Sequence, residues 1–400
     1  MKIEKNENDI VVLSAARTPI GKFGGTLKDV KAFELGAIAI DAAIKKAGID
    51  KDNISEVIYG NCRQAGNGPN PARSAALLAE IPEHIPSSTL NMACPSGMKS
   101  IMLSSDGIMA GSSQLNIAGG MDSMSTIPHL VKGLRFNTLK MGDLKIEDGW
   151  KDATDPIAQT TMGTSAELLA DKFNISRETQ DEFAALSHKR AVQAINEGLF
   201  KDEIAPIKLS PAFDHGWVEL VNDETPRDNT SVEKLLSLKP VFKKEGSVTA
   251  GNSSAMSDGA CALLISSRKN AANMNVLPFF KIVSYAQFAV NGKIMGEGPA
   301  YSIPLVLKKA GLTMKDIDLF EINEAFASQI IANTEVLKID MDRLNIRGGA
   351  IALGHPTGVS GARIVTTLAY TLTHMKKEFG LAAICGAGGV TTSMIIKLEN

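Results

Sequence analysis

The chain lacks several features that would assign it to a specialised class of protein. Its 42 lysines and arginines are balanced by 44 aspartates and glutamates, and a net charge of −2 gives no reason to expect a nucleic-acid partner. No apolar stretch approaches the length that spans a bilayer. The first residues, Met1 to Asp9, lack the apolar core of a signal peptide and are too acidic for a typical transit peptide. These absences predict a soluble, cytoplasmic protein without a membrane partner.

Cysteine is also scarce. Cys62, Cys94, Cys261 and Cys385 form no C-x-x-C pair, and no histidine stands at a zinc-ligand spacing from them. So few thiols in a long chain are typical of a reducing compartment, where a lone cysteine is buried or catalytic rather than bridged. We therefore expect no metal site, and we interpret Cys62 and Cys261 as buried and inert.

What the chain does contain is an internal repeat. Three pairs of segments match in the same order at offsets close to 263 residues, the distance from Gly48 to Gly311. The pairs are Lys46–Ile49 with Lys309–Leu312, Cys94–Gly97 with His355–Gly358, and Leu115–Gly120 with Ala382–Ala387. Three matches in register predict two copies of one fold.

Each copy has the pattern of an α/β fold. Ile10 to Leu13 is typical of a buried strand, and the apolar spacing from Phe33 to Ala47 predicts a helix that ends at Gly48. Short apolar runs that alternate with helical patterns predict mainly parallel strands covered by helices.

The segment between the copies has a different composition and contains both tryptophans, Trp150 and Trp217. We interpret it as an insertion that lies over the first copy, either as a substrate-binding cap or as an oligomerisation insert. The predicted domains are an N-terminal half over 1–124, completed by about 250–275, an inserted loop domain over 125–249, and a C-terminal half over 276–400.

Cys94 and His355 occupy equivalent positions before predicted helices. After Cys94, apolar residues recur at helical spacing as far as Met109, and Gly111 can end that helix. Pro95 suits the first helical position, so Cys94 would lie at or near the N-cap, where the helix dipole lowers the pKa of a thiol. The same dipole disfavours an imidazolium, and we expect His355 to be a neutral base.

Other interpretations of these residues are weaker. A lone cysteine is more often a buried core residue, and a lone histidine beside glycines more often a turn residue, but the repeat relates the two. Gly386–Gly389 could be a dinucleotide loop, yet only 11 residues follow it and the third glycine of that motif is missing. Ser96 and Lys99 fit the S-x-x-K motif of serine acylases, whose companion K-T-G is absent.

Four ordered segments resemble the signature blocks of the thiolases, and the resemblance covers essentially the whole chain. The segments are Asn91–Gly97, Asn323–Ala327, Gly354–Pro356 and Cys385–Gly388, with further similarity at Ala16–Gly21 and Thr249–Asn252. The resemblance implies a five-layer α-β-α-β-α arrangement of two α/β halves, with a loop domain inserted in the first.

The resemblance also implies a role for each site residue. Cys94 would attack an acyl thioester, His355 would take the Cys94 proton and polarise the thioester carbonyl, and Cys385 would remove or return the α-proton of a second acetyl-CoA. Asn323 would hold a water that forms one oxyanion hole with His355, and the backbone N–H groups of Cys94 and Ala387 would form the other. Such a Claisen condensation needs a nearby base, and it needs fixed donors where negative charge develops. No metal or redox cofactor is implied, because CoA is a substrate.

Seven positions match the CoA-binding residues of the family: Arg227, Ser254, Ala250, Met162, Met295, Ala325 and Phe326. Arg227 is the candidate for the charged nucleotide end of CoA, although a solvated loop arginine is an alternative interpretation. The methionines could equally be core residues.

The acyl specificity stays open. Leu139–Leu144 resembles a loop of short-chain biosynthetic enzymes, which are commonly tetramers, whereas Ile294–Tyr301 is more similar to degradative 3-ketoacyl-CoA enzymes. Three residues depart from the short-chain pattern: Pro95 follows the nucleophile, Thr161 replaces a histidine, and Ala387 replaces a glycine.

We expect an acetyl-CoA C-acetyltransferase of fatty acid metabolism, a homodimer or homotetramer that converts two acetyl-CoA to acetoacetyl-CoA and CoA. The first alternative is a degradative 3-ketoacyl-CoA thiolase (acetyl-CoA C-acyltransferase) for longer or unusual acyl chains. The second, of another class, is a non-catalytic acyl-CoA binder, which would have no need of two thiols.

Overall fold

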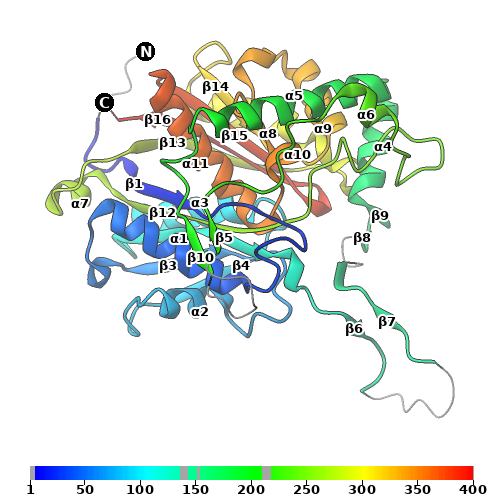
Figure 1. Cartoon of the computed structure of the whole chain (residues 1–400). Coiled ribbons are helices and arrows are strands. Elements are labelled where there is room, and N and C mark those ends of the chain that lie inside the picture. Colours follow the sequence, from blue (N-terminus) through cyan, green and yellow to red (C-terminus); the bar gives the residue numbers. More distant parts are fainter. Residues whose placement is uncertain (1–4, 136–142, 151–153, 210–217, 400) are drawn as a thin grey trace.

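Two half-sheets, one from each copy of the repeat, form the framework of the fold (Figure 1). The computed structural model describes residues 5–135, 143–150, 154–209 and 218–399. The first half-sheet contains β1 (Ile10–Arg17), β2 (Gly21–Lys22), β3 (Glu56–Gly60), β4 (Ser87–Leu90), β5 (Leu115–Ser123) and β12 (Ser257–Ser267). The second contains β13 (Phe280–Ala289), β14 (Leu319–Ile322), β15 (Phe379–Cys385) and β16 (Val390–Leu398). The first strands of the two copies, β1 and β13, pair antiparallel and join the halves.

The prediction of mainly parallel strands is wrong. Only β3 with β4, β3 with β5, and β14 with β15 run parallel in the described sheet, while β12 and β16 are antiparallel to both of their long neighbours. For β15 and β16 the cause is their short connection, because a turn of a few residues can only reverse the chain.

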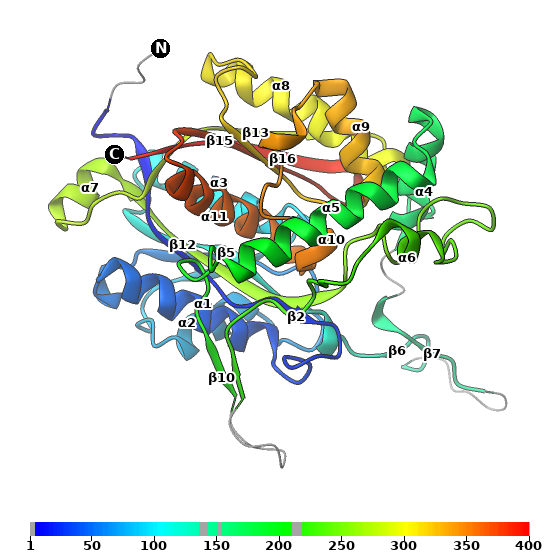
Figure 2. The same ribbon diagram turned by 45° about the horizontal axis from the view of Figure 1, so that its top comes forward.

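Helices cover and separate the half-sheets in five layers, as predicted (Figure 2). The outer helices of the first half are α1 (Ala32–Ala47), α2 (Pro71–Leu78) and α7 (Arg268–Asn273), and those of the second are α8 (Gly298–Ala310) and α9 (Ala327–Leu337). Between the half-sheets lie α3 (Ser96–Met109) and α11 (Thr357–Met375). Each of the three helical layers has its own apolar core, and the central one contains Met98, Val365 and Ile384.

The helix ends follow the repeat closely. The left-handed residues Gly48 (φ 64°) and Gly311 (φ 67°) end α1 and α8, a conformation that glycine adopts without strain. Pro95 and Pro356 are the N-caps of α3 and α11, so Pro95 lies one residue before its predicted position. The equivalence of the two turns is confirmed.

The inserted segment lies mainly over the second copy, not over the first as predicted. Its elements are β6 (Leu130–Val131), β7 (Ile146–Glu147), β8 (Thr154–Asp155), β9 (Thr160–Thr161), α4 (Met162–Phe173), α5 (Arg177–Asn196), β10 (Ile207–Leu209), β11 (Val218–Leu220) and α6 (Val232–Leu236). α4 packs on α9, and α5 packs on α9 and α10 (Ala350–Leu353), because the apolar side chains of Leu169 and Phe183 join the core of the second half. The β10–β11 hairpin packs on the core of the first half, and Phe200 and Ile204 pack with Ile20 of that half.

Short 3₁₀ turns complete the framework at Lys51–Asn53, Met124–Thr126, Gly292–Glu297, Met341–Arg343 and Ala387–Gly389. No helix of the described ranges is long and apolar enough to cross a membrane. Most of the loop at 139–144, which carries the similarity to short-chain enzymes, lies outside the described residues.

Candidate active site

The N-terminal ends of α3 and α11 touch, and the absence of a side chain at Gly97 makes this possible. Gly97 and Gly358 each stand three residues after Cys94 and His355. A Cβ at Gly97 would lie 2.8 Å from the backbone nitrogen of Ala362 and 2.9 Å from the Gly358 carbonyl oxygen, so only glycine fits there. This contact brings Cys94 and His355, which are 261 positions apart in the chain, to one cavity.

The cavity has a volume of about 430 Å³ and is lined by Cys94, His355 and five of the predicted CoA-binding residues. These five are Met162, Ser254, Met295, Ala325 and Phe326. The sequence analysis missed other lining residues: Arg63, Met124, Trp150, Phe242, Met256 and Thr357. Thr161 also lines the cavity and caps α4, because its hydroxyl accepts the Thr164 N–H at 3.1 Å.

The turn before Cys94 is held by Ser96. The Ser96 hydroxyl donates to the Ala93 carbonyl at 2.6 Å and accepts the Met92 N–H at 2.8 Å, and Ala93 has a left-handed φ of 54°. Ser96 is fully buried, and Lys99 bonds Gln287 instead. This geometry excludes the serine acylase interpretation, because a substrate cannot reach the buried Ser96 side chain and its hydroxyl hydrogen is already bonded to the Ala93 carbonyl.

The expectation of a low pKa at Cys94 is wrong. Burial, together with the nearby Cys385 thiol, raises the pKa of Cys94 to about 12. The Ala387 N–H and the Arg63 guanidinium lower it, but by less. A helix N-terminus stabilises an anion by about 1 kcal/mol at most surface sites, which is less than the desolvation of a buried thiolate requires. At neutral pH Cys94 is therefore a thiol.

Cys385 and Asn323 lie at one edge of the second half-sheet. Cys385 ends β15 and Asn323 follows β14, and these strands are parallel neighbours. Burial raises the pKa of Cys385 to about 12. A Cβ at Gly386 would lie 2.4 Å from Cδ of Pro95 and 3.1 Å from the Cys94 nitrogen, so this glycine lets the Cys385 turn approach the nucleophile.

His355 is neutral, as expected, but for a different reason. Burial lowers its pKa to about 3, and the Arg363 guanidinium acts in the same direction. Nδ1 lies 2.6 Å from the Ser360 hydroxyl, which in turn donates to the Pro356 carbonyl at 3.1 Å. With that hydrogen on Pro356, Nδ1 carries the imidazole proton and the unpartnered, buried Nε2 carries the lone pair. The ring is therefore oriented as a base.

Asn323 is fully buried, and neither its side-chain oxygen nor its nitrogen has a hydrogen-bond partner among the described residues. Buried amides normally have partners, so the side chain is suited to bind a water molecule.

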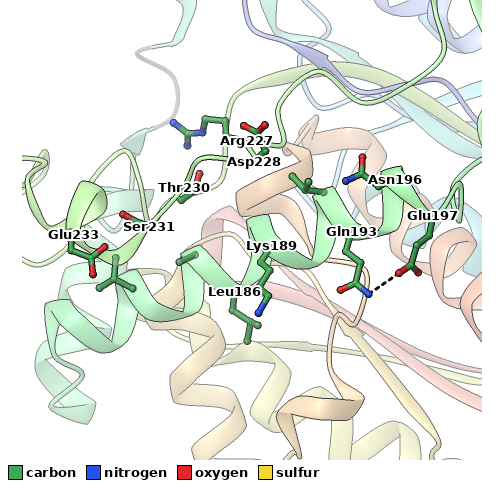
Figure 3. Close-up of a pocket in the computed structure, with 13 residues that line it drawn as sticks. Leu186, Lys189, Gln193, Asn196, Glu197, Arg227, Asp228, Thr230, Ser231 and Glu233 are labelled. Carbon is green, nitrogen blue, oxygen red and sulfur yellow. Dashed lines mark hydrogen bonds between the residues drawn. The ribbon is translucent and has the colours of Figure 1, made fainter.

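Two predicted CoA positions lie away from this cavity. Arg227 lines a separate cavity of about 670 Å³ between α5 and residues 227–233, where its Nη2 lies 3.3 Å from Nε2 of His188 (Figure 3). Lys189 and Gln193 extend from α5 on the opposite side of the figure from Arg227. Ala250 is exposed and lines neither cavity.

The two cysteines predicted to be buried and inert, Cys62 and Cys261, differ in their burial. Cys261 is fully buried, as predicted, whereas Cys62 is only partly buried and stands next to the cavity residue Arg63. Burial raises the pKa of Cys62 to about 12, so it too is a thiol. The described residues contain no cluster of histidine, cysteine, aspartate and glutamate that could hold a metal ion.

The sequence analysis missed a buried carboxylate, Asp122, that fixes two segments next to the cavity. Asp122 accepts the N–H groups of Cys62 (3.1 Å), Arg63 (3.0 Å) and Gly358, and the Thr357 hydroxyl at 2.8 Å. One side chain thus ties the 62–63 loop to the first turn of α11. It lies just past the repeated run at 115–120, which is the only signal of it in the sequence.

Comparison with known proteins agrees with these features over nearly the whole chain. The thiolase N-terminal domain model matches residues 10–269, and the thiolase C-terminal domain model matches residues 276–398. A probable acetyl-CoA acyltransferase of Staphylococcus aureus is 43% identical over 97% of this chain and 98% of its own length.

Two solved structures are also similar. The acetyl-CoA acetyltransferase of Bacillus anthracis superposes with a TM-score of 0.95 at 39% identity, covering 98% of this chain and 99% of that one. Human mitochondrial 3-ketoacyl-CoA thiolase in complex with CoA superposes with a TM-score of 0.94 at 38% identity, with the same coverage.

Proposed function

The chain belongs to the thiolase family, and we propose that it forms and cleaves 3-ketoacyl-CoA by moving an acyl group between Cys94 and CoA. One observation carries the assignment of residues. Cys94 and a neutral imidazole with a free Nε2 meet at a single cavity, and the Cys385 thiol, from a third segment, packs with the cavity residues Met295, Ala325 and Phe326 without lining the cavity itself. A protein that only bound acyl-CoA would gain nothing from this arrangement.

In the first step, the Cys94 sulfur attacks the thioester carbonyl while its proton passes to Nε2 of His355. The C–S bond to CoA then breaks, and the leaving CoA thiolate takes the proton of the Cys385 thiol, so that Cys385 becomes a thiolate while His355 keeps the Cys94 proton. Because both groups are neutral at rest, proton transfer must accompany attack. The backbone N–H groups of Cys94 and Ala387 are the proposed donors to the oxyanion.

In the second step, the Cys385 thiolate removes the α-proton of an acetyl-CoA, and the resulting enolate attacks the acyl group on Cys94. The C–S bond to Cys94 breaks, and the Cys94 sulfur takes back the proton held by His355. The enolate oxygen would be stabilised by His355 and by a water on Asn323, whose unpartnered amide supports this role. CoA enters and leaves as a substrate, and these steps need no metal or redox cofactor. Of the proposed CoA residues, the five that line the cavity would contact the pantetheine end, and Arg227 and Ala250 would lie farther along the molecule.

The reaction expected from the sequence is the condensation of two acetyl-CoA, which uses the shortest acyl group that a thiolase can transfer. A longer or unusual acyl chain is a second candidate, because Thr161, Arg63 and Trp150 line the cavity together with Cys94. Purified protein assayed for thiolysis across 3-ketoacyl-CoA chain lengths distinguishes the two. A maximum at acetoacetyl-CoA supports the acetyltransferase, and a maximum at longer chains supports the alternative.

Cys94→Ala tests the mechanism directly. It should abolish both thiolysis and condensation, whereas Cys62→Ala should retain them. Turnover that survives Cys94→Ala would refute the assignment, and CoA binding without turnover in the wild type would establish a binder instead. The homodimeric or homotetrameric state, the role in fatty acid metabolism and the cytoplasmic location stay proposals, of which light scattering of the purified protein tests the first.

A further inference from the structure

A cationic side chain lines the cavity beside the nucleophile without a bonded partner. The Arg63 guanidinium makes no hydrogen bond or ion pair with any described residue, and its Nε is buried and unpartnered. Arg63 as a whole is only partly buried, but a buried polar atom such as its Nε normally has a hydrogen-bond partner. Asp122 accepts both the Arg63 N–H and the hydroxyl of Thr357, which stands two residues after His355, so Arg63 lies near the reacting end of the cavity.

Trp150 holds this guanidinium in place. The Arg63 guanidinium carbon stands 4.8 Å from the centre of a Trp150 ring, and Trp150 in turn packs edge-on against Phe23 at 6.4 Å. The indole Nε1 of Trp150 is a second buried donor with no partner among the described residues, and Trp150 lines the same cavity. Two unsatisfied donors in contact with each other indicate a missing acceptor.

The acidic neighbour Asp122 does not provide this acceptor. Burial raises the pKa of Asp122 and the Arg63 charge acts to lower it, but the carboxylate oxygens of Asp122 already accept the backbone N–H groups of Cys62, Arg63 and Gly358. Asp122 is also absent from the cavity lining, whereas Arg63 is part of it. The guanidinium is therefore available to a group inside the cavity.

We propose that Arg63, with Trp150, is a specificity-determining pair that binds a carboxylate at the far end of a short acyl chain. This inference rests on the proposed function. A guanidinium and an indole N–H match the acceptor geometry of a carboxylate, and hydrogen bonds to charged groups are among the strongest in proteins. The substrate class is a 3-ketoacyl-CoA whose acyl group ends in a carboxylate, in addition to neutral chains.

The test compares two six-carbon 3-ketoacyl-CoA substrates, one ending in a carboxylate and one in a methyl group. The measured quantity is the ratio of their kcat/KM values in thiolysis. The wild type should favour the carboxylate, and Arg63→Met should lower the ratio by about 10- to 100-fold. Arg63→Lys should restore part of it, and Trp150→Phe, which keeps the ring but not the N–H, should lower it by a smaller factor. Lys45→Met, on the outer helix α1, is the charge control and should leave the ratio unchanged.

The outcomes separate this inference from the proposed function. A ratio that Arg63→Met leaves unchanged overturns the inference, and so does an equal loss on both substrates, which would mean that Arg63 acts only on the Cys94 charge. In both cases thiolysis of the neutral substrate by the wild type still supports the proposed function. A wild type that cleaves neither substrate would refute the proposed function and this inference together.

Discussion

The contact between α3 and α11 predicts that a single methyl group will disturb the site. In Gly97→Ala, the new Cβ would lie 2.8 Å from the Ala362 nitrogen and 2.9 Å from the Gly358 oxygen, both of them backbone atoms. An ordinary contact needs about 3.4 Å or more, so the helices must move apart by about half an ångström. Alanine is favoured over glycine in a helix by about 1 kcal/mol, but overpacking costs about 1–3 kcal/mol. We expect a net loss of up to about 2 kcal/mol.

The effect on turnover should exceed the effect on stability. The two helices carry Cys94 and His355 at their N-terminal ends, and a misplacement of 1 Å can reduce a rate by about 100-fold. A displacement of half that size should reduce kcat for thiolysis by about tenfold. Steady-state assays and urea denaturation of the same preparation measure the two quantities separately.

Gly107→Ala is the matched control, because Gly107 lies in the same helix. Its Cβ would meet side-chain atoms and no backbone of another element: Ser113 Oγ at 3.2 Å, Ser112 Oγ at 3.3 Å and Asn116 Nδ2 at 3.9 Å, and the two serine side chains can rotate away. This variant should be as stable as the wild type or up to about 1 kcal/mol more stable, with unchanged turnover. If Gly97→Ala behaves like Gly107→Ala, the close approach of the helices does not position the site.

Three further predictions concern the groups around this contact. Ser360→Ala removes the partner of His355 Nδ1, so kcat should fall about tenfold and the acid limb of the pH–rate profile should move. Ser360→Thr keeps a hydroxyl and should restore both. An unchanged profile in Ser360→Ala would contradict the assigned orientation of the ring. The pKa of His355 is about 3 in the folded protein and about 6.5 when unfolded, so its contribution to stability is present above pH 6.5 and is lost as the pH falls towards 3. Between pH 8 and 5 the wild type should lose about 2 kcal/mol more than His355→Gln in urea denaturation, and parallel losses would refute the buried neutral histidine. Asp122→Asn places an NH₂ group among donors and should destabilise the fold by about 1–3 kcal/mol, with Asp52→Asn on the surface as the neutral control.

Local patterns in the sequence predicted the helices well. The glycine stops at Gly48 and Gly111 and the equivalence of the Cys94 and His355 turns depend on neighbouring residues only, and all are found. Strand direction was predicted wrongly, although the sequence held a signal. Only a short turn separates the apolar run that ends at Cys385 from the next one at Val390, and so short a connection joins antiparallel strands.

The site residues that the sequence did not predict were missed for a different reason. Arg63, Trp150 and Asp122 come from three segments whose meeting depends on how β3, β5 and the insertion pack, and no local pattern encodes that packing. Likewise, the placement of the insertion over the second half follows from apolar side chains on α4 and α5, whose periodicity identifies a buried face but not its partner. The domain boundaries near 124, 249 and 275 stay predictions.

The pKa values of the two helix-start residues explain why equivalent turns serve different roles. At His355, the helix N-terminus, burial and Arg363 all disfavour the charged form, so the base stays neutral. At Cys94, the helix N-terminus favours the anion while burial opposes it, and burial prevails. The resting site is therefore a neutral pair that needs no counter-charge in a largely apolar cavity. Charge develops only when a thioester carbonyl is present to receive it, at the place where the Ala387 N–H already points towards the Cys94 sulfur.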